Sequence, residues 1–143
     1  MKTKSGALLQ FKKILDKRGS LCFIEKCNNI PFEIKRIYYI YDVPSNENRG
    51  AHAHKKLHQI FIAISGSFVL KLFNGKQEKE YFLNEPSKGL HVGPNIWRTL
   101  YQFSSGAVVL VIASNKYNKE DYIRNIGEYK KYMAKTKNYP ILA

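Results

Sequence analysis

The feature that most constrains the fold is a series of short apolar segments rich in Ile, Val, Phe and Tyr, separated by turn residues at intervals of about eight to twelve positions. The strands expected from this pattern are residues 21–25, 34–43, 58–64, 67–73, 77–83, 90–92, 97–103 and 107–113, with a short strand or turn at 11–15. Asn74-Gly75 predicts a type I′ hairpin turn, and the Ser/Gly turns at 65–66 and 104–106 are expected to join antiparallel neighbours. Strands of this length and spacing indicate an all-β sandwich or barrel.

The C-terminal segment has helical rather than strand periodicity. Asn118 is expected to cap a helix that has Glu120 and Asp121 in its first turn. An apolar stripe at helical spacing follows, and we interpret it as packing against the sheets: Tyr122, Ile126, Tyr129 and Met133. The expected organisation is a single domain over residues 1–143, with its core at about 11–132 and terminal extensions at 1–10 and 135–143.

The formal net charge is +13, from 24 Lys and Arg against 11 Asp and Glu. This excess favours an anionic partner. The lysines are spread along the whole chain, and no arginine-rich run or basic amphipathic stripe is present, so the charge does not by itself predict nucleic-acid binding. Cys22 and Cys27 form no disulfide framework. No apolar run approaches the roughly 18 residues of a membrane-spanning helix, and the apolar stretch near the N-terminus is too short for a signal peptide. We therefore expect reduced cysteines, a cytoplasmic location, and neither a membrane nor a nucleic-acid partner.

The segment at residues 49–56, RGAHAHKK, holds two of the four histidines. Side chains two residues apart on a strand point to the same side, so His52 and His54 are expected to project together, with Arg49 at the bend before them. Paired imidazoles beside fixed cations suit acid/base chemistry on an anionic ligand. The alternative of two surface histidines on a turn stays open from spacing alone.

The alternation of side chains along the strand expected at 34–43 also bears on function. Arg36, Tyr38 and Ile40 share one face, and a cation on so aromatic a strand indicates either a polar, ligand-lined interior or a solvent face.

A metal site is the alternative role for the His-x-His pair, with His91 as a third ligand on a later strand. Residues 55–61 contain no Asp or Glu, and His58 and Gln59 stand where a carboxylate ligand would be needed. The sequence therefore favours metal-free chemistry with no cofactor.

Taken together, these motifs resemble the sugar-nucleotide 3,4-ketoisomerases (WxcM-like) of the cupin superfamily. The resemblance runs from about residue 11 to 132 and rests on IKRIYYI at 34–40, RGAHAHKKLHQ at 49–59, GLHVGP at 89–94, Trp97-Arg98, Ala113-Ser114 and DYIR at 121–124. It implies a cupin jelly-roll barrel of antiparallel strands with a C-terminal α-helix.

The resemblance also implies a reaction. Members convert dTDP-4-keto-6-deoxy-D-glucose to the 3-keto sugar through an enediol(ate), for deoxyamino-sugar and surface-glycan synthesis. By that resemblance His52, His54 and Tyr38 are catalytic, with His54 assigned as the base at C3 and His52 to proton transfer at C4. The expected substrate-binding residues are Arg18, Arg36, Arg49, Lys55, Arg98 and His91. Asp121 and Arg124 are interpreted as capping and surface-pairing residues.

Three points stay open at this stage. The family varies at the positions of Arg18 and Arg98, and arginine at both leaves the C4 configuration of the product (galacto or gluco) unassigned. The resemblance implies a homodimer that exchanges strands near the N-terminus. The alternatives are a sugar-nucleotide-binding cupin without turnover, a metal-dependent cupin enzyme and, more distantly, a nucleic-acid binder.

Overall fold

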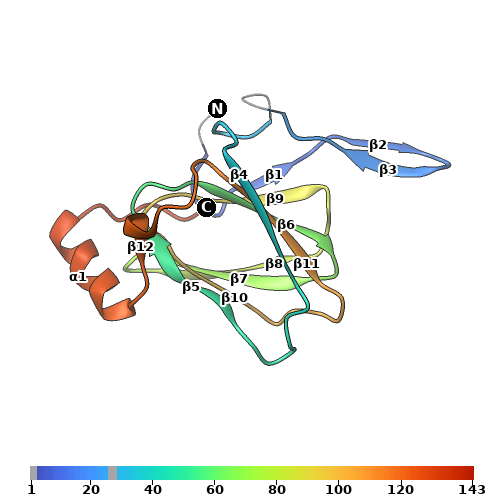
Figure 1. Cartoon of the computed structure of the whole chain (residues 1–143). Helices are drawn as coiled ribbons and strands as arrows, with labels where there is room; N and C mark the ends of the chain where they lie inside the picture. Colours follow the sequence, from blue (N-terminus) through green and yellow to red (C-terminus); the bar gives the residue numbers. More distant parts are fainter. Residues whose placement is uncertain (1–2, 26–28) are drawn as a thin grey trace.

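The computed structural model describes residues 3–25 and 29–143, so Cys27 lies outside the described residues. Within this part of the chain, two five-stranded sheets face each other (Figure 1). The first sheet has the order β1 (Leu8–Gln10), β9 (Lys88–Val92), β6 (Gln59–Ser65), β11 (Val108–Ala113), β4 (Arg36–Tyr41). The second has the order β12 (Tyr122–Ile123), β5 (Arg49–His54), β10 (Trp97–Tyr101), β7 (Phe68–Phe73), β8 (Glu78–Leu83). The paired strands are antiparallel, so the predicted all-β architecture is confirmed.

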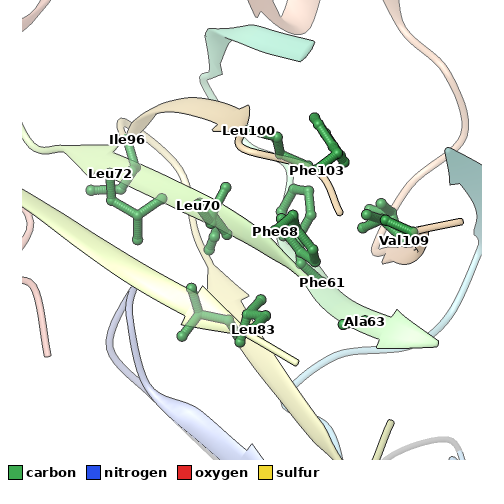
Figure 2. Close-up of a cluster of buried hydrophobic side chains, with 14 of the residues drawn as sticks. Phe61, Ala63, Phe68, Leu70, Leu72, Leu83, Ile96, Leu100, Phe103 and Val109 are labelled. Atoms are coloured by element: carbon green, nitrogen blue, oxygen red, sulfur yellow. The ribbon is translucent and has the colours of Figure 1, made fainter. Parts of the chain in front are cut away.

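The main hydrophobic core lies between the two sheets (Figure 2). Phe61 and Ala63 of β6 enter it from the first sheet, and Phe68 and Leu70 of β7 meet them from the second. The alternate residues of β6 point the other way, and Ile60 and Ile62 pack under the N-terminal segment with Phe11. Strand β6 is therefore covered on both faces, which explains why its sequence is a continuous apolar run rather than an alternating one.

Two of the expected hairpins are instead crossings between the sheets. Strands β6 and β7 flank Ser65-Gly66 but belong to different sheets, and β10 and β11 around residues 104–106 do the same. The two turns contact each other, because the Ser67 amide donates to Ser104 Oγ over 2.8 Å and the Ser104 amide donates to the Ser67 carbonyl over 2.9 Å. The expected antiparallel pairing across these turns is thus wrong. The apolar inner faces of the strands pack across the sandwich rather than pairing edge to edge.

The Asn74-Gly75 turn does close a hairpin, which joins β7 to β8. Its geometry differs from type I′, which requires positive φ at two central residues. Here Gly75 has φ 97, while Asn74 and Lys76 have none in that range. The Asn74 side-chain oxygen instead accepts from the amides of Lys76 and Gln77, at 2.9 and 2.7 Å, and this fixes the turn.

The C-terminal segment is divided into two short helices rather than one. Asn118 caps a 3-10 helix, η1 (Lys119–Asp121), and Asn125 caps α1 (Ile126–Thr136). Tyr122 is in strand β12, and only Tyr129 and Met133 of the expected stripe are buried helix residues. Strand β12, which lies between Asp121 and Asn125, pairs with β5, and because of this pairing its residues are not helical. Helix α1 covers the outer face of the second sheet.

The chain termini also differ from the expected extensions. Strand β1 pairs with β9, and Leu142 belongs to the main core. The hairpin of β2 (Lys13–Asp16) and β3 (Gly19–Cys22) pairs with neither sheet and projects from the body of the molecule (Figure 1). No helix in residues 3–25 or 29–143 has the length and apolarity needed to span a membrane.

Candidate active site

His52 and His54 lie together on β5, as their spacing predicted. Their Nε2 atoms are 3.1 Å apart, and His52 Nδ1 donates to the Gly50 carbonyl over 2.8 Å. A β-bulge makes this geometry possible: His52 pairs with Arg98 and Gly50 with Thr99, which leaves Ala51 as the extra residue, with φ 50. Gly50 has φ 87, and a Cβ there would lie 3.1 Å from Leu100 Cδ1, so the bulge favours glycine.

A carboxylate lies behind this pair. Asp121 Oδ2 is 3.0 Å from His54 Nδ1, and Asp121 Oδ1 accepts the Lys56 amide over 2.8 Å. Asp121 therefore holds the imidazole of His54, and the sequence interpretation of it as a capping residue is wrong. Asp121 and His54 are 67 positions apart in sequence, so no local pattern signals this contact. The pairing of β12 with β5 brings them together.

Burial and a neighbouring cation set the protonation of both histidines. Desolvation, with the charge of Arg98 next, lowers the pKa of His52 to about 4 and also lowers the pKa of His54. Both imidazoles are accordingly neutral at pH 7 and can accept a proton. His54 is fully buried, whereas His52 is half-buried.

Tyr38 is held by a chain of two hydrogen bonds that starts at a buried arginine. Arg98 Nη1 donates to Gln59 Oε1 over 2.6 Å, and Gln59 Nε2 donates to the Tyr38 hydroxyl oxygen over 2.9 Å. Arg98 has only donors, so the amide orientation of Gln59 is fixed, and Tyr38 keeps its own proton for another acceptor. Burial raises the pKa of Tyr38 and keeps the phenol protonated.

These groups meet at a cavity of about 460 Å³ between the two sheets. Among the described residues its lining contains four arginines and no carboxylate: Arg36, Arg49, Arg98 and Arg124, with Tyr38, His52, Asn48 and Tyr122. Three guanidinium nitrogens are buried without a hydrogen-bond partner, namely Nε and Nη2 of Arg36 and Nε of Arg98. Burial lowers the pKa of Arg98 to about 10, so it stays charged at neutral pH. Unpaired cationic donors around a concave site are suited to an anionic ligand.

The structure brings together five of the nine site residues predicted from sequence along the cavity wall, namely Tyr38, His52, Arg36, Arg49 and Arg98, with His54 directly behind His52. The face shared by Arg36, Tyr38 and Ile40 of β4 thus lines the cavity between the sheets and is not a solvent face. Tyr122 and Arg124 also line the cavity, and Arg124 lies over the Tyr122 ring at 4.2 Å. The DYIR motif belongs to the sequence resemblance, but the surface-pairing role predicted for Arg124 is corrected by its place in the cavity wall.

The three other predicted residues lie elsewhere. Arg18 is at the exposed tip of the β2–β3 hairpin, where it pairs with Asp16. Lys55 lies over the ring of Tyr132, 5.8 Å from its centroid. His91 accepts or donates at Thr3 Oγ1 over 2.7 Å and at His58 Nδ1 over 3.0 Å, beside a separate cavity of about 490 Å³. Its neighbours on β9, Leu90 and Val92, belong to the main core between the sheets, so the side chain of His91 points to the opposite, outer face of the first sheet and does not line the same cavity as His52.

Within the described ranges, no group of three or more His, Cys, Asp or Glu side chains is arranged to hold a metal ion. The histidines form two separate pairs, His52 with His54 and His58 with His91.

The model of the FdtA family, described as WxcM-like, C-terminal, matches residues 4–134. The chain belongs to the FdtA family. A TDP-4-oxo-6-deoxy-alpha-D-glucose-3,4-oxoisomerase from Aneurinibacillus thermoaerophilus is 48% identical to this FdtA-family chain over 128 residues, which are 90% of the chain and 92% of the relative.

Solved structures of FdtA-like enzymes superpose closely. The 3,4-ketoisomerase QdtA from Thermoanaerobacterium thermosaccharolyticum, as a mutant in complex with TDP-4-keto-6-deoxyglucose, matches with 46% identity and a TM-score of 0.88, over 90% of this chain and 94% of QdtA. The TDP-quinovose 3,4-ketoisomerase WlaRB from Campylobacter jejuni matches with 46% identity and a TM-score of 0.84, over 87% of this chain and 96% of WlaRB. The resemblance to 3,4-ketoisomerases, the cupin-like fold and the isomerase class inferred from sequence are confirmed.

Proposed function

We propose that this FdtA-family protein converts dTDP-4-keto-6-deoxy-D-glucose to the corresponding 3-keto sugar. The observation that carries the proposal is the cavity itself, in which a neutral histidine and a protonated tyrosine lie among four arginines. Moving a keto group between adjacent carbons requires a base, a donor at the developing oxyanion and cations for the diphosphate. The oxoisomerase relative and the QdtA complex support the same substrate.

His52 is the group placed to exchange a proton with the sugar carbons. It lines the cavity, whereas His54 is fully buried behind it. The assignment of His54 as the base at C3 is therefore replaced, because a side chain with no exposed surface does not reach a ligand in this cavity. In the proposed mechanism His52 removes the C3 proton and His54 acts through His52.

Tyr38 and Arg98 stabilise the charge that forms on the sugar. As the C3–H bond breaks, its electron pair forms a C3=C4 double bond and the negative charge moves to O4. Tyr38, which accepts from Gln59, donates its proton toward this oxygen, and the unpaired Nε of Arg98 adds a fixed positive charge. A proton then binds C4, and the hydroxyl proton passes from O3 to O4, giving the 3-keto, 4-hydroxy sugar with all atoms conserved.

Arg49 and Arg124 are assigned to the diphosphate. Both are exposed residues of the cavity lining, in contrast to the buried Arg98, and guanidinium groups bind phosphate oxygens in bidentate geometry. Exposure at the mouth of the cavity suits the more polar part of the substrate, and it leaves the sugar next to His52 and Tyr38.

The test is proton NMR of dTDP-4-keto-6-deoxyglucose incubated with the protein in deuterated water, with and without a chelator. The proposal expects loss of the C3 proton and deuterium at C4, at the same rate in both samples. The coupling constants of the product give its C4 configuration. A bound ligand without exchange would instead identify a sugar-nucleotide-binding cupin, and activity abolished by the chelator would identify a metal-dependent enzyme.

We also propose a homodimer in which the β2–β3 hairpin of each chain lies against its partner, and a cytoplasmic location with the free Cys22 reduced. The hairpin projects from the body (Figure 1) and exposes large apolar side chains, as does the outer face of β4: Ile14, Leu15, Leu21, Ile37, Tyr39 and Tyr41. An exposed apolar surface of this kind supports a protein interface. In such a dimer Arg18 at the hairpin tip would reach the cavity of the partner subunit. That position would agree with the prediction that Arg18 is a substrate-binding residue.

The dimer is tested by light scattering after size exclusion. We expect the mass of two chains for the wild-type protein and a shift toward one chain for Leu15→Asp. Lys130→Asp, at an exposed position of α1 outside the hairpin and β4, is the control and should leave the mass unchanged. A wild-type mass of one chain would contradict the proposal.

A further inference from the structure

The hydrogen-bond partners of His52 determine which of its nitrogens carries a proton. Its Nδ1 is 2.8 Å from the Gly50 carbonyl oxygen, which can only accept. The proton of neutral His52 is therefore on Nδ1, and its Nε2 carries a lone pair. That lone pair faces His54 Nε2 at 3.1 Å.

The partners of His54 lead to the same result. Its Nδ1 is 3.0 Å from Asp121 Oδ2, and the other carboxylate oxygen of Asp121 accepts the Lys56 amide over 2.8 Å. An ionised carboxylate only accepts, so the proton of neutral His54 is also on Nδ1, and a second lone pair faces His52.

The two lone pairs converge on one position between the imidazoles. Two lone pairs at 3.1 Å repel each other, whereas one proton between them forms an N–H···N hydrogen bond. The alternative tautomer, with a proton on His54 Nε2, would fill this position permanently, but it would leave the His54 Nδ1 lone pair facing the Asp121 carboxylate.

From this geometry we propose that Asp121 is a positioning residue that fixes the His54 tautomer, so that His52 and His54 act as one acceptor for a single proton. This inference rests on the proposed function and adds to it the place where the proton is held. The proton leaves C3 with its bonding electrons remaining on the sugar, binds His52 Nε2 and is shared with His54 Nε2. While the pair holds it, this proton exchanges with solvent; a proton is then returned to C4 from the same position, and both imidazoles are neutral again.

Charge compensation supports this assignment. The shared proton adds one positive charge next to Arg98, which opposes it. Asp121 is the carboxylate in contact with the pair, and its charge stabilises the protonated state through His54. The acceptor position between the two imidazoles therefore carries no proton at rest and can hold one during turnover.

The test uses Asp121→Asn in protein labelled with ¹⁵N-histidine. The amide oxygen of asparagine can still accept the Lys56 amide, but its NH₂ group would donate to His54 Nδ1 and move the His54 proton to Nε2. The four histidine spectra are assigned by replacing His58 and His91, which lie outside the cavity. We expect His54 to be protonated at Nδ1 in the wild-type protein and at Nε2 in Asp121→Asn.

The same variant should lose turnover without losing the ligand. Because the acceptor position is filled, we expect kcat to fall by about 10²- to 10³-fold, while KM and TDP binding change less than about threefold. Glu120→Gln is the matched control: it removes an exposed carboxylate from the same 3-10 helix, and both the His54 tautomer and kcat should be unchanged.

Three outcomes would overturn the inference: wild-type His54 protonated at Nε2, an unchanged tautomer in folded Asp121→Asn, or a switched tautomer with unchanged kcat. If Asp121→Asn does not fold, the wild-type spectrum alone decides the tautomer. A wild-type protein that fails to exchange the substrate proton would overturn the proposed function, and the spectra would still decide the role of Asp121 in fixing His54.

Discussion

The amide of Gln59 donates to the hydroxyl oxygen of Tyr38 over 2.9 Å, and its direction is imposed by Arg98 on the other side of the amide. Gln59 is fully buried at the start of β6, so no solvent competes for these bonds. The consequence is a phenol whose proton is available to a ligand. The donor role of Tyr38 thus depends on Gln59, a residue that does not line the cavity.

Changing Gln59→Glu should reverse this direction. A carboxylate beside Arg98 is ionised and only accepts, so the Tyr38 hydroxyl would donate to it instead of to the sugar oxygen. We expect kcat to fall by about 10²-fold or more, which is typical for loss of one oxyanion donor, with the midpoint of thermal unfolding unchanged or raised by the new ion pair. Steady-state kinetics and calorimetry check this.

Two variants make that result specific. Gln77→Glu adds the same charge at an exposed position of the β7–β8 hairpin and should have wild-type kinetics. Tyr38→Phe should lose as much activity as Gln59→Glu, and the double variant should lose little more, because both changes remove one donor. Wild-type turnover in Gln59→Glu would show that the hydroxyl direction does not matter.

The pH dependence of kcat/KM should have its acid limb well below the ordinary histidine range. His52 must be unprotonated to act as a base, and burial with Arg98 lowers its pKa to about 4. Activity is therefore expected to stay level from about pH 5.5 to 8 and to be lost as the pH falls through that pKa. Samples held at low pH and assayed at pH 7 separate titration from unfolding; an acid limb centred near 6.5 would contradict the prediction.

Replacing Arg98→Met should raise the pKa of His52. The Arg98 charge is, after burial, the largest cause of the lowered value, so its removal favours the imidazolium form. Turnover should fall by at least about 10²-fold because Gln59 and Tyr38 lose their orientation. An NMR titration of His52 measures the shift. Lys130→Met, which removes an exposed cation from α1, is the control and should leave the pKa of His52 in place.

Tyr129→Phe should destabilise the protein without changing the chemistry. The Tyr129 hydroxyl donates to the carbonyls of Asn95 and Phe73, at 2.8 and 3.0 Å, and the side chain is fully buried under α1. Leaving a buried acceptor unsatisfied costs about 1–3 kcal/mol. Urea unfolding should show a loss of that size, whereas Tyr132→Phe on the same helix should show little change.

Alternation and turn chemistry were enough to place most strands, because those signals are local. Strand β4 is an example, since period-two alternation put Arg36 and Tyr38 on one face, although it left open whether that face is interior or solvent. Local signals did not give the connections. Ser65-Gly66 looks like a hairpin turn in sequence, and only the packing of Phe61 against Phe68 across the core decides that the chain changes sheets there.

The site was predictable to the same extent. His52 and His54 followed from their spacing on one strand, but the partner on the far side of His54 did not. Asp121 reaches His54 only because β12 pairs with the edge of β5. An acidic residue in the first turn of the helix that Asn118 caps was already a sufficient explanation of Asp121 from sequence. His91 shows the reverse error, because a histidine on a later strand fits a ligand pattern while its side chain points to the outer face of the first sheet, away from the core between the sheets.

The unpartnered nitrogens of Arg36 and Arg98 have a consequence for how this fold responds to its ligand. An anionic substrate that accepts from these donors binds the folded protein and not the unfolded chain, in which the donors do not converge. Binding therefore stabilises the fold by mass action: at a hundred times the dissociation constant the ligand adds about 2.7 kcal/mol to the free energy of unfolding. In a cell, the abundance of such a protein would follow the supply of its sugar nucleotide.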